Sequence, residues 1–568
     1  MDSSRALLTI LAEYKVSHVF GLPGETTLPL YGEWSEYTDV EHILVRDERN
    51  SAIMADGYAR ASFRPGVCEA PGVGASYLLP GVAEAYASSI PLVVLTSDIP
   101  EGYEFRNSLS RYEQMLMFRG ITKESSTVHR PDDLPASLRR AFRVSTSGRP
   151  GPVHLRVPED VLQGRIRDED DVYAQEEFSA FPGQRFAPDD ARVRAALDLL
   201  LRAERPVIMC GQGVLLSQAW GEVRKLAEAL AVPVGTTITG KGAFSETHPL
   251  SIGVVGSRGG TTFSNSVVAD ADLVFYIGSN VDYAATVGWT VPPPGRCKIL
   301  HLDISGEELG NAYRTSVFLH GDAKLTLQRM FTLLDGPKPS RRRSAREAGL
   351  AKERKEYDDH VASIAGKTKG PPNPFLFVKA LSAKVKEDTI LAADPGVGAI
   401  YTSAFYRVSR AGRTFIYNYS LGGLGFALAE GIGAHFASKR PVIVLTGDGS
   451  MGFNVGELET IRRTGADVKV ILFNNHSFGW IRAAAKAMGV KPFHTQFGEV
   501  DYLKVAEGFG LEARRLGAGD NIEETLAEFL GHGKQSFLEV DSLPEDEVFP
   551  PVPSWKKLAE KTGVRYLG

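Results

Sequence analysis

Thr446-Gly447-Asp448-Gly449-Ser450 follows the apolar run Pro441–Leu445, and Asn474-Asn475 follows a second apolar run, Val468–Phe473. Short β-branched runs of this kind are typical of strands that are buried on both faces of a parallel sheet. In a strand–helix–strand unit, the carboxyl ends of both strands meet at one edge of the sheet. The Asp448 carboxylate and the Asn475 amide oxygen are therefore predicted to converge where a divalent cation such as Mg²⁺ binds.

The segment between the two strands is predicted to be a helix. Asn454 followed by Glu457 has the spacing of a capping box at a helix start, and Gly465 is a typical C-terminal stop. Asp-Gly alone is common in turns, and Asn-Asn alone is common at loop starts. Both pairs together, at the ends of adjacent strands, favour a site for Mg²⁺ and a diphosphate.

The spacing of Gly447-Asp448-Gly449-Ser450 from Asn474-Asn475 resembles the cofactor signature of thiamine diphosphate (ThDP) enzymes. The chain is similar over essentially its whole length to the acetolactate synthase and 2-oxo acid decarboxylase branch. The resemblance implies that the side chains of Asp448 and Asn475 and the carbonyl of Ser477 hold Mg²⁺. It also implies that backbone N–H groups of Gly449 and Ser450, with the turn Val397-Gly398-Ala399, hold the diphosphate.

Length and the order of motifs predict the architecture. A chain of 568 residues is too long for one core. Strand, loop and helix alternate throughout, so the fold class is α/β with three doubly wound parallel-sheet domains. The expected domains are a pyrimidine-binding domain at residues 1–165, a central domain at 186–336, and a domain for diphosphate and Mg²⁺ at 371–568. The polar stretches between these domains, including the Lys- and Arg-rich residues 337–370, are predicted to be linkers.

Composition excludes several classes of protein. A net charge of −5 argues against a nucleic-acid binder. Cys68, Cys210 and Cys297 have no metal-binding spacing, which fits a reducing cytoplasm. No stretch is long and apolar enough to span a membrane, and the first residues do not open a signal peptide. We therefore expect a cytoplasmic protein that acts on a small molecule, without a nucleic-acid or membrane partner.

Two further motifs extend the resemblance. Arg46-Asp47-Glu48, followed by Ala55–Arg60, is similar to a family motif that places Glu48 on the pyrimidine nitrogen of ThDP. In the family this glutamate comes from one subunit and the diphosphate site from its partner, which implies a homodimer or homotetramer. Gly422-Gly423-Leu424 resembles the segment that bends the cofactor, with Leu424 as the wedge and the Gly422 carbonyl as a hydrogen-bond acceptor. The same segment also fits the Gly-rich start of a buried helix.

The residues expected near the substrate are Gly24, Glu25, Gly74, Ser110, Met451, Trp480, Ile481 and His494. Ser110 stands where acetolactate synthases carry a glutamine, and this departure leaves the reaction open. The resemblance favours decarboxylation of a 2-oxo acid such as pyruvate, with transfer of the enamine to an acceptor. The alternatives are a simple 2-oxo acid decarboxylase, a 2-hydroxyacyl-CoA lyase or, in another class, a non-catalytic scaffold paralogue. Retention of Glu48, Asp448 and Asn475 together argues against the scaffold.

The central domain gives weaker signals. Asn280 replaces an arginine of flavin-binding relatives, which argues against FAD. Asp303-Ile304 could contact an adenosine, so an ADP- or CoA-type nucleotide stays open. Gly235–Gly242 nearly spells a phosphate-binding loop, but Gly242 replaces the Ser or Thr that would bind Mg²⁺, so we interpret the match as chance.

Overall fold

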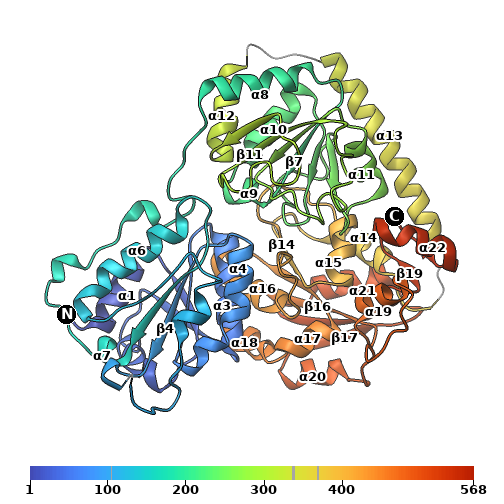
Figure 1. Ribbon diagram of the computed structural model, residues 1–568. Coiled ribbons are helices and arrows are strands. Elements are labelled where there is room, and N and C mark those ends of the chain that lie inside the picture. Colours follow the sequence, from blue (N-terminus) through green and yellow to red (C-terminus); the bar gives the residue numbers. More distant parts are fainter. Residues whose placement is uncertain (104, 335–339, 367–369) are drawn as a thin grey trace. The chain divides into compact units, whose positions relative to one another are not determined.

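The computed structural model describes residues 1–103, 105–334, 340–366 and 370–568. It contains three six-stranded parallel sheets flanked by helices (Figure 1), which confirms the predicted α/β class. The residues group into two compact units. The first unit consists of Met1–Gln184, Asn418–Val442 and Gly452–Val468, and the second of Arg185–Tyr417, Ile443–Met451 and Lys469–Gly568. The predicted end of the central domain, residue 336, lies outside the described residues.

The first unit contains a sheet with the strand order β2-β1-β3-β4-β6-β5. Its strands are β1 (His18–Gly21), β2 (Glu41–Leu44), β3 (Gly66–Ala70), β4 (Leu92–Asp98), β5 (Glu124–Thr127) and β6 (Val153–Pro158). β1, β3, β4 and β6 are buried along their whole length, as expected for strands covered on both faces. Figure 1 shows α1 (Ser3–Glu13) and α6 (Leu134–Thr146) on one face and α3 (Glu48–Ser62) and α4 (Leu79–Ala87) on the other.

Helix α16 (Ala427–Ser438) also belongs to the first unit and packs along α3. Glycines allow the two backbones to touch. A Cβ atom at Gly433 would overlap the carbonyl oxygen of Met54, and one at Gly57 would overlap that of Glu430. The close contact between α3 and α16 therefore requires glycine at positions 57 and 433.

The second unit contains the central sheet and the C-terminal sheet. The central strands are β7 (Pro206–Cys210), β8 (Val234–Thr236), β9 (Ser251–Val254), β10 (Leu273–Ile277), β11 (Lys298–Asp303) and β12 (Val317–His320). Their order, β9-β8-β7-β10-β11-β12, is the 3-2-1-4-5-6 order of dinucleotide-binding folds. Helices α8 (Asp190–Arg202), α10 (Trp220–Leu230) and α12 (Ala323–Leu333) pack together on one face (Figure 1).

The C-terminal sheet repeats the strand order of the first sheet. It contains β13 (Ile390–Ala393), β14 (Phe415–Tyr417), β15 (Val442–Gly447), β16 (Val468–Asn474), β17 (Glu512–Leu516) and β18 (Ser536–Asp541). Their order is β14-β13-β15-β16-β18-β17, which corresponds to 2-1-3-4-6-5 in both sheets. Among its helices are α14 (Pro374–Lys384), α15 (Val397–Phe405), α19 (Gly479–Ala487), α20 (Tyr502–Gly508) and α21 (Ile522–Gly531). The chain ends in α22 (Lys556–Thr562) and the short pair β19 (Val548–Phe549) and β20 (Arg565–Tyr566).

The predicted linker after the central domain contains a long helix, α13 (Ser340–Ala365). Good helix formers dominate this segment, and Lys352–Glu356 and Lys355–Asp359 form ion pairs one turn apart. Leu350, Val361 and Ala365 are buried, and many of the described positions between residues 344 and 365 are charged. The described part of this predicted linker is therefore a helix held by a few buried apolar positions.

The predicted helix between β15 and β16 is two helices. α17 (Asp448–Asn454) and α18 (Glu457–Thr464) follow one another, and α18 ends at Gly465 in the left-handed conformation, as predicted. The capping box is wrong, because Gly456 precedes α18 and the Asn454 amide donates to the Gly425 carbonyl. Among the described residues, no helix combines the length and hydropathy needed to cross a membrane.

Candidate active site

The residues predicted to hold a metal meet at the carboxyl edge of the C-terminal sheet. Asp448 begins α17 directly after β15, and Asn475 follows β16. The Ser477 N–H donates to Asp448 Oδ2 at 3.1 Å and to Asn475 Oδ1 at 3.2 Å. The preceding Asn474 turns the other way, and its amide donates to Glu539 at 2.7 Å. Only the second asparagine of the pair therefore faces Asp448.

The donors at this edge fit a hard divalent cation. Asp448 is 6% exposed, and its burial raises the pKa of the carboxyl group to about 6. Glu545 lies next to Asn475, and burial raises its pKa to about 7, with a further contribution from the charge of Asp448. A carboxylate, an amide oxygen and a backbone carbonyl at Ser477 are the oxygen donors that Mg²⁺ accepts. No group of three or more His, Cys, Asp or Glu side chains suited to a metal occurs in the described ranges.

The predicted diphosphate turn follows β13, the strand next to β15 in the sheet. Gly396 has a φ of +105° and precedes α15, which starts at Val397. A Cβ atom at Gly398 would lie 3.1 Å from the Leu445 carbonyl oxygen, so the helix start approaches β15 closely. Thr446 donates to Asp394 at 2.7 Å and joins the two strand ends. Ala399 is buried behind this turn, while Gly449 and Ser450 form the first turn of α17.

Glu48 lies in the first unit, at the first residue of α3 after β2. Its side chain is half-buried, and Asp47 caps the helix by accepting from the Arg49 N–H. A Cβ atom at Gly74 would lie 2.8 Å from Glu48 Oε1, so the glycine leaves room for the carboxyl group. Pro71 separates Gly74 from Gly24, which precedes the short 3₁₀ turn of Glu25. The structure thus brings Glu48, Gly24 and Gly74 to one edge of the first sheet.

The segment predicted to bend the cofactor is held by buried polar side chains of the first unit. Glu84, 1% exposed on α4, accepts from the N–H groups of Ser420 at 3.1 Å and Leu421 at 2.8 Å. Gly422 follows with a φ of +71°, and Leu424 is half-buried. Sequence reasoning missed Glu84, because nothing in the helical pattern of α4 distinguishes it from a solvated glutamate.

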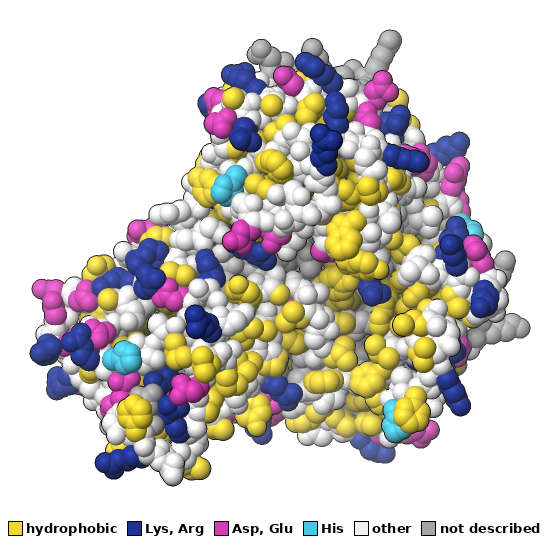
Figure 2. All heavy atoms as spheres, viewed as in Figure 1, with side chains coloured by type: hydrophobic (Ala, Val, Ile, Leu, Met, Phe, Trp, Pro, Cys, Tyr) yellow, Lys and Arg dark blue, Asp and Glu magenta, His cyan; other side chains and the backbone are white. Residues whose placement is uncertain are grey.

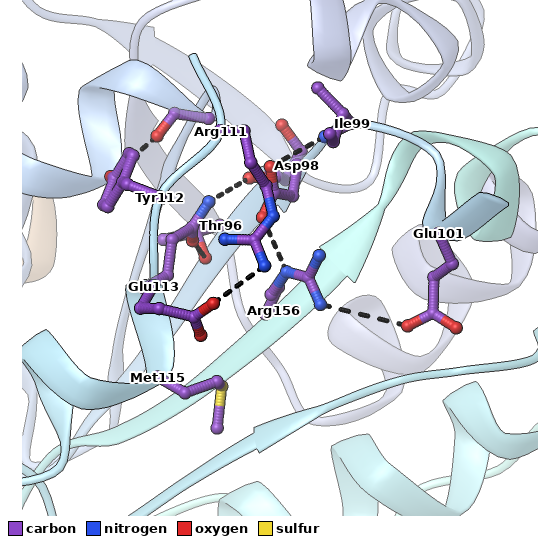
Figure 3. A network of polar contacts seen from close by, with 12 residues as sticks. Thr96, Asp98, Ile99, Glu101, Arg111, Tyr112, Glu113, Met115 and Arg156 are labelled. Atoms are coloured by element: carbon purple, nitrogen blue, oxygen red, sulfur yellow. Dashed lines mark hydrogen bonds and ion pairs between the residues drawn. The ribbon is translucent and has the colours of Figure 1, made fainter. Parts of the chain in front are cut away.

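The loop that carries Ser110 is fixed by a polar network (Figure 3). Tyr112 donates to the Gly72 carbonyl at 2.8 Å, and Gln114 bridges Thr96 at 2.7 Å and the Ser97 carbonyl at 3.0 Å. Beneath it, the buried Arg156 pairs with Asp98 at 2.7 Å. Ser110 itself is exposed with a φ of +64°, whereas Tyr112, two residues further on, contacts the turn that contains Gly72.

The other predicted substrate residues have different surroundings. Met451 is buried in α17, and Ile481 is 56% exposed on α19. Trp480 packs on Trp555 at 4.6 Å between ring centroids and carries the Arg258 guanidinium on its face. His494 lines an open pocket of about 460 Å³ with Arg482, Lys486, Pro492, Thr495 and Gln496.

The near phosphate-loop motif of the central domain has a different explanation. Lys241 is completely buried and donates to Glu246 and to the carbonyls of Ser403 and Tyr406. Its charge is neutralised by Glu246 rather than directed to a ligand.

Comparison with known proteins identifies the family. Three models match: the thiamine pyrophosphate enzyme N-terminal TPP binding domain at residues 1–117, the central domain at 193–330 and the C-terminal TPP binding domain at 394–540. The chain belongs to the thiamine pyrophosphate enzymes.

Relatives within this family cover nearly the whole chain. The probable acetolactate synthase large subunit of Methanocaldococcus jannaschii is 32% identical over 98% of this chain and 94% of the relative. The acetolactate synthase isozyme 1 large subunit of Escherichia coli is 30% identical over 98% of this chain and 97% of the relative. The predicted family is confirmed, and this thiamine pyrophosphate enzyme uses ThDP. Family membership favours an enzyme over the non-catalytic scaffold.

Proposed function

We propose that this enzyme decarboxylates a 2-oxo acid such as pyruvate and transfers the remaining unit to an acceptor, as an acetolactate synthase-like carboligase that requires Mg²⁺. The observation that carries the proposal is the convergence of Asp448, Asn475 and Ser477 at one sheet edge. The similarity to acetolactate synthase large subunits over nearly the full length supports it.

In this proposal, Asp448 and Asn475 bind Mg²⁺ through side-chain oxygens and Ser477 through its carbonyl. Backbone N–H groups of Gly449, Ser450 and the turn Val397-Gly398-Ala399 hold the diphosphate. When bound, ThDP supplies a carbon nucleophile for the substrate carbonyl and a cationic ring that takes up the electrons released by C–C cleavage.

Glu48 has the proton-transfer role. Its carboxyl group is half-buried in the space that Gly74 leaves open, where it can hold a proton or release it to a bound ring nitrogen. Leu424 would pack against ThDP when it is bound, and the carbonyl of Gly422 would accept a hydrogen bond from the amino group of ThDP. Glu84 holds the backbone just before these two residues by accepting from the N–H groups of Ser420 and Leu421.

The roles near the substrate stay predictions for Gly24, Glu25, Gly74, Ser110, Met451, Trp480, Ile481 and His494. A second candidate reaction, cleavage of a 2-hydroxyacyl-CoA, has one observation in its favour. The pocket beside His494 contains Arg482 and Lys486, two cations that share the single carboxylate of Asp546, and the net positive charge left suits an anionic substrate. The central sheet, with its dinucleotide-binding strand order, leaves an ADP- or CoA-type nucleotide open.

We also propose a cytoplasmic homodimer or homotetramer in which Glu48 of one copy completes the site of its partner. Apolar side chains lie on the visible face of the first unit over α4 (Figure 2). Val73 is 53% exposed, Tyr77 50% and Tyr86 43%. Exposed apolar groups gathered in this way are typical of association surfaces.

The experiment is turnover of pyruvate by the purified protein with ThDP and Mg²⁺, measured as release of CO₂ and formation of acetolactate. Glu48→Gln should keep ThDP affinity within about threefold and lower kcat by at least about 100-fold, because a positioned proton donor is lost. Glu41→Gln, on β2 just before α3 and with a largely exposed side chain, is the matched control and should keep full turnover.

Three outcomes decide between the proposals. No binding of ThDP in the presence of Mg²⁺ would refute the proposed site. Binding without turnover of pyruvate, but with cleavage of a 2-hydroxyacyl-CoA, would favour the second candidate. Unchanged kcat in Glu48→Gln would remove Glu48 from the chemistry.

A further inference from the structure

Glu545 lies beside the predicted metal ligand Asn475, in the segment that follows β18. The Asn475 amide nitrogen donates to Glu545 Oε2 at 3.3 Å, and Glu545 is 2% exposed. The glycine at position 479 creates the space for this carboxylate, because a Cβ atom there would overlap Oε2. The contact is therefore built into the packing between α19 and the C-terminal tail.

A carboxylate can only accept hydrogen bonds, whereas an asparagine amide presents a donor on one side and an acceptor on the other. Glu545 consequently requires that the NH₂ group of Asn475 faces the tail. The Oδ1 atom then faces the opposite side, where it accepts from the Ser477 hydroxyl at 3.0 Å and the Ser477 N–H at 3.2 Å. Asp448 Oδ2 accepts from the same N–H, so Oδ1 and the Asp448 carboxylate border one space.

We infer that Glu545 is a positioning residue that orients Asn475 so that its oxygen, and not its NH₂ group, faces the bound cation. The inference rests on the proposed Mg²⁺ site. Without Glu545 only the two Ser477 donors favour this orientation, so the amide rotates by half a turn more readily and directs a donor at the cation, which removes one of the protein's ligands. Outer-sphere partners of this kind typically contribute about 10- to 100-fold in metal affinity.

The neighbouring residue supplies a matched control. Asp546 Oδ2 accepts from Arg482 Nε at 3.0 Å and from Lys486, both on α19, and so anchors the same tail segment. The structure gives it no hydrogen bond to Asn475. A substitution at Asp546 therefore tests the loss of tail anchoring, and a substitution at Glu545 tests the loss of amide orientation.

The test is the dissociation constant of Mg²⁺ measured by calorimetry with ThDP present, at about pH 8 where carboxylates are ionised. Glu545→Ala should weaken Mg²⁺ binding about 10- to 100-fold. Glu545→Gln, which keeps an acceptor oxygen for the Asn475 amide, should restore affinity to within about threefold. Asp546→Asn should also stay within about threefold of the wild type, because it leaves the Glu545–Asn475 contact in place.

Two results would overturn the inference while leaving the proposed site intact. Equal weakening of Mg²⁺ binding by Glu545→Ala and Asp546→Asn would assign the effect to tail anchoring. Mg²⁺ binding as weak in Glu545→Gln as in Glu545→Ala would assign the effect to the charge of Glu545. A wild-type protein that binds no Mg²⁺ with ThDP would instead refute the proposed function itself.

A second measurement keeps the inference testable if Glu545→Ala does not fold. In an Asn475→Asp background the side chain has no NH₂ group to orient, and its carboxylate is repelled by Glu545. Adding Glu545→Gln to Asn475→Asp should then strengthen Mg²⁺ binding relative to Asn475→Asp alone. A further weakening in the double variant would contradict the positioning role.

Discussion

His154 lies on β6 and is completely buried among polar partners of the first unit. Thr96 contacts its Nε2 atom at 2.7 Å, Ser125 contacts Nδ1 at 2.8 Å, and the ring stacks on Phe118 at 3.9 Å. Burial lowers the pKa of His154 to about 3, with a smaller contribution from the charge of Arg156. The folded protein therefore keeps this imidazole neutral at pH values where the unfolded chain protonates it.

This shift predicts the direction of a pH effect on stability. Above the unfolded pKa of about 6.5, His154 is neutral in both states and contributes no pH dependence. As the pH falls from about 6.5 toward 3, only the unfolded state takes up a proton, so stability is lost. The loss at pH 5 should be about 2 kcal/mol from this residue. Urea unfolding at pH 7 and pH 5, followed by circular dichroism, should show a smaller difference in His154→Gln than in the wild type. His129→Gln, an exposed histidine of the same unit, should behave like the wild type.

Residues at this scale were the least accessible to sequence reasoning. Glu84 acts on Ser420, 336 positions away, and Glu545 acts on Asn475, 70 positions away. A single glutamate forms no sequence pattern that would predict its burial. Its hydrogen-bond partner lies far away in the sequence and is identified only in the folded structure. Asp448 and Asn475 could be predicted because each follows a recognisable apolar strand.

At the scale of elements, hydrophobic runs predicted strands well and polar composition predicted helices poorly. β15 and β16 lie where their apolar runs indicated. The composition of α13 resembles that of a linker, since a helix exposed on most of its surface needs few apolar positions. The break between α17 and α18 was missed because Asn454 bonds to Gly425 rather than to its own segment.

The contact between α3 and α16 yields a prediction at the same scale. Gly433→Ala would place a Cβ atom against the Met54 carbonyl, so the helices must separate, at a cost of about 1–3 kcal/mol. Because Glu48 is the first residue of α3, the same shift should also reduce turnover. Thermal melting and kcat measure the two effects. Gly32→Ala is the control, since this helical glycine has open space around it and alanine there should be neutral or stabilising. Equal melting temperatures for both variants would show that the helices accommodate the methyl group.

At the scale of the whole molecule, the predicted residues are distributed over two sheets of the same strand order. Glu48 follows β2 of the first sheet, and Asp448 follows β15 of the C-terminal sheet. The repeated order was not visible in the sequence as a repeat, because equal topology requires only equivalent alternation of strands and helices. The domain boundaries at 165, 186 and 371 stay predictions.

The last prediction concerns how two copies share the active site in the proposed dimer. If Glu48 of one copy serves the Asp448 site of its partner, then a mixed dimer of Glu48→Gln and Asp448→Ala chains contains one site with both defects and one site with neither. Co-expression with two different tags and tandem purification isolates such mixed dimers, which should recover about half of the wild-type pyruvate turnover per dimer. Each variant alone should keep at most about 1% of the wild-type turnover, and two differently tagged Glu48→Gln chains purified together are the control. If instead Glu48 and Asp448 act within one chain, every site in the mixed dimer carries a defect, and no turnover should return even though ThDP still binds to the Glu48→Gln copy.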